Sequence, residues 1–130
     1  MNLLLAAAAV LAMATGVVHS VLGERLIFRR LRQASLVPSA PAPPLQERHI
    51  RILWASWHLV SVLGWAMAAL LWRLAAGTDS GLPADVLLNV IAWGFFAGSL
   101  LVLVATRGRH PGWIALAAVA VSAWLGMGSA

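Results

Sequence analysis

The sequence predicts an all-α integral membrane protein: an antiparallel up-down bundle of four transmembrane helices with both termini outside. Hydrophobic residues make up 62% of the 130 residues and charged residues only 10%, whereas soluble domains carry about 25% charged residues. The apolar residues form four long runs, and most charged residues gather between the runs. The runs do not alternate with a period of two residues, so they favour helices over a barrel as the structure that crosses the bilayer.

The four runs predict one membrane domain over residues 1–130. A helix needs roughly 20 apolar residues to cross the hydrocarbon core. The first three runs reach that length, and the fourth can extend to the C-terminus because no charged residue follows Arg109. The expected helices cover residues 3–28, 49–74, 83–106 and 111–128.

The first run is not preceded by any lysine or arginine, and the positive charges come after it. This order favours a retained anchor with its N-terminus outside over a cleaved signal peptide. In residues 24–32, Arg25, Arg29 and Arg32 recur at helical spacing among apolar residues. We expect this stretch to continue the first helix into the headgroup layer, where each arginine near anionic lipid contributes about 1 kcal/mol.

The connection to the second helix is rich in proline. Residues 33–46 contain Pro38, Pro41, Pro43 and Pro44. Because such a composition favours extended polyproline geometry, the segment is expected to be a linker on the cytoplasmic side.

The third and fourth helices begin at prolines, Pro83 and Pro111, whose missing N–H is tolerated in a first helical turn. Gly94 and Gly98 form a GxxxG pattern in the third helix, and the first helix carries a comparable stripe of small residues. Small residues let helices approach closely in lipid. The pattern leaves open whether the contact lies within one chain or between copies.

The arginines predict the orientation. They cluster in the first and third connections, whereas the second connection carries Asp79. The positive-inside rule therefore places the first and third connections in the cytoplasm. Trp54, Trp57 and Trp113 lie near that boundary, as is typical of interfacial tryptophans. We attribute the positive charge to topology, expect no nucleic-acid partner, and expect a multi-pass protein of a bacterial inner membrane.

Two histidines inside the apolar runs are the main indication of a site, since ionisable groups are costly in a bilayer. His19 lies six residues before Arg25, and His58 lies seven residues after Arg51. Both are therefore about 10 Å along their helices from those charges. On antiparallel neighbours the two imidazoles would lie at similar depth. The predicted ligand-binding residues are His19, Glu24, Arg51, His58 and Ser61.

Three interpretations of this cluster stay open. In the structural one, Glu24 pairs with Arg51 and the histidines hydrogen-bond locally. In the second, the cluster binds a lipid headgroup, an anionic solute or a proton, which includes a proton-coupled or anion carrier acting as a dimer. In the third, His19 and His58 are the ligands of haem or of a metal ion in a membrane redox component, with haem b as the cofactor candidate, because imidazole suits iron, copper and zinc.

Several motifs typical of enzymes are missing from the sequence. The chain has no HExxH, no GxSxG, no phosphate-binding glycine loop, no carboxylate pair inside a helix and no cysteine, so neither an enzyme nor a dedicated metal site is expected. The sequence favours a small membrane protein that binds a lipid, a small ligand or a partner subunit. Membrane lipids and a homo-oligomer or larger membrane complex are the expected partners.

Overall fold

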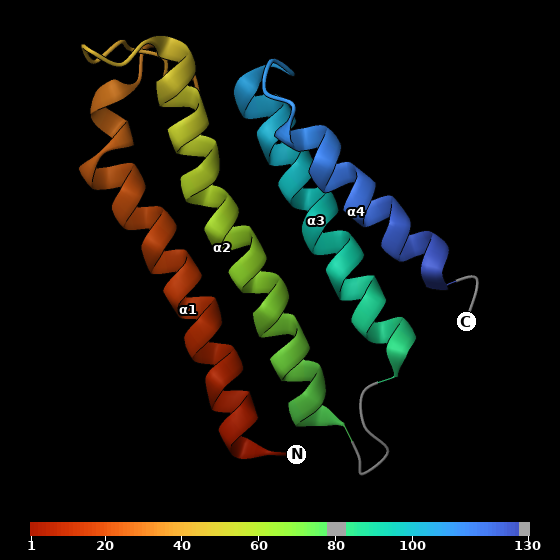
Figure 1. Ribbon diagram of the computed structural model, residues 1–130. Coiled ribbons are helices and arrows are strands. Elements are labelled where there is room, and N and C mark those ends of the chain that lie inside the picture. The colour runs from red at the N-terminus through yellow and green to blue at the C-terminus, as the bar shows by residue number, and fades with distance from the viewer. Residues whose placement is uncertain (78–82, 128–130) are drawn as a thin grey trace.

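The computed structural model describes residues 1–77 and 83–127 and is all-helical (Figure 1). Its helices are α1 (Leu3–Leu26), the 3₁₀-helix η1 (Phe28–Leu31), α2 (Glu47–Ala76), α3 (Ala84–Thr106) and α4 (Gly112–Met127). The described residues form no β-strand. Asp79 and the expected last residue of the fourth helix, at position 128, lie outside the described residues.

Three helices, α1, α2 and α3, are long and apolar enough to cross a membrane, and α4 is a shorter apolar helix. Large apolar side chains of these helices point outward: Leu4 is 84% exposed, Val60 62% and Val104 65%. Monomeric soluble proteins rarely expose so much apolar surface. The structure therefore supports the prediction of a helical membrane protein.

The helices pack in chain order: α1 against α2, α2 against α3, and α3 against α4 (Figure 1). Among the described residues the extensive helix–helix packing is confined to these three consecutive pairs. The helices therefore form a row with α1 and α4 at its two ends. The C-termini of α1 and α3 lie at the same end of the helices as the N-termini of α2 and α4 (Figure 1). We call this end the arginine-rich end.

Small residues of α1 allow α2 to approach closely. A Cβ atom added at Gly16 would collide with the indole of Trp65, and one added at Gly23 would collide with the indole of Trp57. In α3, a Cβ at Gly94 would lie 2.8 Å from Cβ of Ala66. The small-residue patterns are therefore used within this chain, which the sequence left open.

The chain between α1 and α2 differs from the expectation in two ways. The continuous helix through residue 32 is wrong, because α1 ends at Leu26 and Ile27 adopts φ −115° before η1 begins. The linker 33–46 is not simply extended either, since Ser39 and Ala40 both donate backbone N–H groups to the carbonyl oxygen of Leu31. The segment folds back onto the arginine-rich end.

Apolar burial holds this segment in place. Phe28 and Val37 are buried together with Trp54 of α2 and Val102 and Ala105 of α3. The cluster therefore joins η1, the linker and two helices. Burial of this apolar cluster is the physical reason why a proline-rich linker departs from extended geometry here.

The turn from α3 to α4 is tight. Gly108 N–H donates to the Leu103 carbonyl oxygen at 2.9 Å, and Arg107 N–H donates to that of Val104 at 3.3 Å. These two bonds form a Schellman motif, whose left-handed position is usually glycine. Here Arg107 occupies it with φ 53°. The motif places arginine side chains beside the N-terminus of α2.

Candidate functional site

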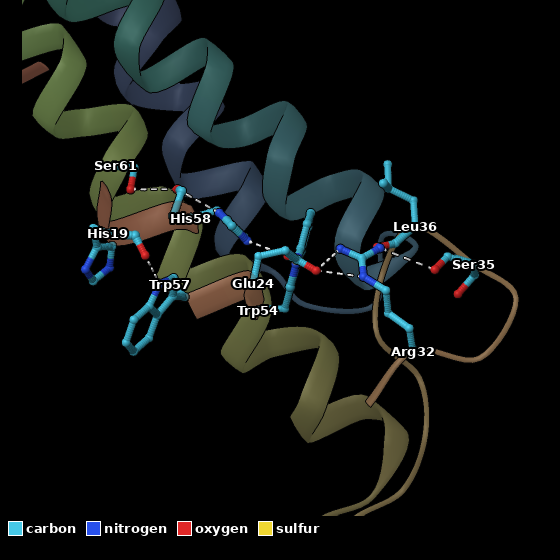
Figure 2. Close-up of polar contacts among 10 residues, drawn as sticks. His19, Glu24, Arg32, Ser35, Leu36, Trp54, Trp57, His58 and Ser61 are labelled. Carbon is cyan, nitrogen blue, oxygen red and sulfur yellow. Dashed lines mark hydrogen bonds and ion pairs between the residues drawn. The ribbon is translucent and has the colours of Figure 1, made fainter. Parts of the chain in front are cut away.

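Glu24, at the end of α1, is the centre of a polar cluster made by Ser20, Glu24, Arg32, Trp54, His58 and Ser61, which we call the Glu24 cluster (Figure 2). Its Oε1 accepts hydrogen bonds from Nε of Arg32 at 2.7 Å and from Nη2 of the same guanidinium. Its Oε2 accepts from the indole N–H of Trp54 at 3.1 Å. Hydrogen bonds of this kind to a charged group contribute about 1.5–3 kcal/mol.

His58 extends this cluster toward the middle of the helices. Its Nε2 lies 3.4 Å from Oε2 of Glu24, an ion-pair distance without hydrogen-bond geometry. Its Nδ1 lies 2.9 Å from Oγ of Ser20, which donates to Oγ of Ser61 at 2.8 Å. A neutral imidazole has one N–H, so only the protonated ring can direct a donor at both Glu24 and Ser20.

His19 lies apart from this chain of contacts. Its imidazole stacks on the indole of Trp57 with the centroids 4.3 Å apart and the planes 7° from parallel. Trp57 also donates its indole N–H to the His19 carbonyl oxygen at 3.0 Å. Figure 2 shows His19 beside Trp57, while His58 points toward Glu24. The two histidines come from neighbouring helices, but their rings are directed at different partners.

The expected pairing of Glu24 with Arg51 is wrong. Arg32 binds Glu24, because the chain turns at Ile27 and returns over the end of α1. Arg51 has Glu47 as its acidic neighbour instead, with 3.7 Å between Nη1 and Oε1. Its side chain is buried, with the residue 6% exposed, and its Nε and Nη1 have no hydrogen-bond partner among the described residues.

Arg51 lines a cavity of about 440 Å³ at the arginine-rich end, between the start of α2 and the α3–α4 turn. We call it the basic pocket. Four arginines and one glutamate contribute to its wall, so its charge is strongly positive. It is lined by Gln46, Glu47, Arg48, Arg51, Ile52, Thr106, Arg107, Arg109 and His110.

The structure thus brings together Glu24, His58 and Ser61 of the predicted residues and separates His19 and Arg51 from them. Sequence reasoning missed Arg32, Ser20 and the role of Trp54, which was assigned to the interfacial belt. One signal for Trp54 was present: it lies four residues before His58 and so shares its helix face. Arg48, Arg107 and Arg109 were counted only as topological charges.

The described residues contain no group of three or more histidine, cysteine, aspartate or glutamate side chains placed to hold a metal ion. Comparison with models of known protein families, with curated proteins and with solved structures gives no match. The Glu24 cluster and the basic pocket are therefore the features that bear on function.

Proposed function

We propose that this protein is a non-enzymatic, multi-pass membrane protein that binds an anionic group of the phosphate type in the basic pocket. The observation that carries the proposal is the buried guanidinium of Arg51, whose Nε and Nη1 lack hydrogen-bond partners among the described residues. A buried charge without partners is costly by several kcal/mol. A phosphate satisfies it well, because the planar guanidinium can donate two parallel hydrogen bonds to its oxygens.

The acid in the pocket does not meet this need. Oε1 of Glu47 lies 3.7 Å from Arg51 and 3.6 Å from Arg107, so one oxygen is shared between two guanidiniums at distances longer than a hydrogen bond. Two further arginines, Arg48 and Arg109, line the same cavity. The remaining positive charge favours an anion of one or two charges.

His110 supplies a further donor. The backbone N–H of Gly112 donates to Nδ1 of His110 at 3.1 Å. The neutral ring must then carry its proton on Nε2, because Nδ1 is occupied as an acceptor. His110 lines the pocket. Its Nε2–H therefore gives the pocket a neutral hydrogen-bond donor in addition to the guanidinium groups of the arginines.

The proposal includes the predicted topology: four antiparallel crossings, both termini outside, and the arginine-rich end in the cytoplasm of a bacterial inner membrane. Eight of the nine arginines lie in the two connections at that end or within a few residues of them, which supports this topology. Membrane phospholipids and dissolved phosphate are both sources of the anion. A homo-oligomer, a larger membrane complex and a dimeric anion carrier stay predictions.

The test is calorimetric titration of the full-length protein in uncharged detergent with inorganic phosphate and with dihexanoyl phosphatidylglycerol. Arg51→Gln should weaken binding of these anions about tenfold or more. Arg73→Gln is the matched control, because it removes the same charge from the other end of α2. Absence of binding to the unaltered protein, or an equal loss in both variants, would overturn the proposal.

A second candidate function, binding of haem b by His19 and His58, is supported by one observation. Nε2 of each histidine is buried without a hydrogen-bond partner among the described residues, and Ser20 holds Nδ1 of His58 as an outer-shell partner would. The stacking of His19 on Trp57 argues against a shared ligand. An absorption spectrum of the protein purified after expression with added haem tests this function. Absence of a Soret band would contradict haem binding.

A further inference from the structure

An apolar groove opens beside the basic pocket. It is a cavity of about 240 Å³ between α2, α3 and α4. Three residues, Ile52, Thr106 and His110, line both cavities, so the groove and the basic pocket are adjacent. The groove is lined by Ile52, Ala55, Ser56, Leu59, Val102, Thr106, His110, Gly112, Ala115 and Leu116.

The groove leads from the charged end toward the middle of the helices. On α2 its wall extends from Ile52 to Leu59, about 10 Å along the helix axis. Its one buried hydroxyl is already used, since Oγ1 of Thr106 donates to the Val102 carbonyl oxygen at 2.7 Å. A bound water needs two to four polar partners, so the inner part of the groove suits an apolar chain better than water.

We infer that the ligand of the basic pocket is an anionic glycerophospholipid, with its phosphate at Arg51 and one acyl chain in the groove. The inference rests on the proposed function and names the molecule that carries the phosphate. Its basis is that a basic cavity and an apolar one lie side by side and share three lining residues: a phospholipid joins an anionic headgroup directly to an apolar chain. A free phosphate would fill only the basic pocket.

The acyl chain in the groove gains little from the hydrophobic effect, because it moves from the apolar interior of the bilayer into an apolar groove of the protein. The affinity therefore comes from the arginines, and the groove selects among anions by length and shape. Separate substitutions should therefore weaken the binding of the headgroup and the binding of the acyl chain. Arg51 tests the headgroup, and Ala115 tests the chain, since it is exposed and lines the groove on α4.

The experiment is native mass spectrometry of the full-length protein from nanodiscs that contain dioleoyl phosphatidylglycerol or dioleoyl phosphatidylcholine. We expect one retained phosphatidylglycerol and weaker retention of phosphatidylcholine. Arg51→Gln should lower the retention of phosphatidylglycerol about tenfold to a hundredfold. Ala115→Leu should remove the preference for dioleoyl over dihexanoyl phosphatidylglycerol while inorganic phosphate still binds.

Ala118→Leu is the control for the groove, because Ala118 is exposed on the same helix and does not line it. Equal binding of short-chain and long-chain lipid by the unaltered protein would overturn the inference and leave the proposed function standing. A dimer mass that Ala115→Leu abolishes would show a second copy in the groove, which also overturns it. Absence of all anion binding by the unaltered protein would instead count against the proposed function.

Discussion

The side chains of Glu24 and Arg32 form an ion pair across the turn that follows α1, with Nε of Arg32 2.7 Å from Oε1 of Glu24. Nη1 of the same guanidinium donates to the carbonyl oxygens of Ser35 and Leu36. Arg32 therefore ties the end of α1 to the beginning of the linker.

Replacing Arg32 should loosen this segment. In Arg32→Gln we expect the free energy of unfolding to fall by about 1–3 kcal/mol, because a half-buried carboxylate loses its charged donor. Thermal unfolding in detergent measures the loss, and limited proteolysis should show faster cleavage within residues 33–46. Arg30→Gln, an exposed neighbour on η1, should change neither. If Glu24→Gln and Arg32→Gln prove additive in the double variant, the two side chains do not interact.

We expect the Arg107 side chain to lower the stability of the fold and to strengthen phosphate binding. Its φ of 53° lies in the left-handed region, which costs a residue with a side chain roughly 1–2 kcal/mol. Arg107→Gly should therefore melt at the same or a higher temperature, even though it loses the exposed pair with Glu47. Its phosphate binding by calorimetry should be weaker.

Gly108 provides the comparison, because its φ of 73° also lies in the left-handed region. Gly108→Ala should lower the free energy of unfolding by about 1 kcal/mol and leave phosphate binding intact. A lower melting temperature in Arg107→Gly would contradict the account of the turn.

Gly23 should be intolerant of a side chain, because a Cβ there would overlap the Trp57 indole. We expect Gly23→Ala to lower the free energy of unfolding by about 1–3 kcal/mol, as overpacking does. At Gly64 an added Cβ meets no atom within 4 Å, so Gly64→Ala should gain about 0.5–1 kcal/mol from helix propensity. Thermal denaturation of both variants checks the α1–α2 packing, and an equal effect in the two would refute it.

His19 should accept an apolar ring. Because its imidazole stacks on Trp57 and makes no side-chain hydrogen bond among the described residues, His19→Phe should keep a melting temperature close to that of the unaltered protein. His19→Ala, which removes the stack, should lose about 0.5–1.5 kcal/mol. A bound haem whose Soret band disappears in His19→Phe would instead favour the cofactor interpretation.

The distribution of apolar residues was enough to predict helices and a membrane protein. Charged residues and prolines separate the apolar runs in the sequence and so mark the connections between helices. The segment after α1 could not be predicted in this way, since the helical spacing of Arg25, Arg29 and Arg32 indicates a continued helix. Its turn at Ile27 depends on the bond from Arg32 to Glu24 and on the burial of Phe28, which are properties of the folded chain.

The candidate sites show the same limit. Counting residues gave His19 and His58 similar depths, but depth leaves the rotation of each helix undetermined, and the two rings meet different partners. Arg51 was among the predicted binding residues, whereas its pocket was not predicted. That pocket forms because the α3–α4 turn brings Arg107 and Arg109 beside Arg51, although more than fifty residues separate them from Arg51 along the chain.

By itself the sequence determined that the chain is helical, that its apolar runs are those of a membrane protein, and where the arginines gather; it predicted four membrane-spanning helices, of which three are long and apolar enough in the structure. These properties are local, because hydropathy adds up along a continuous run. Only the tertiary structure decided which acid meets which base and which buried donors lack a hydrogen bond. Glu24 pairs with Arg32, and Nε and Nη1 of Arg51 have no hydrogen-bond partner among the described residues, because such contacts depend on helix rotation and on the path of the connections.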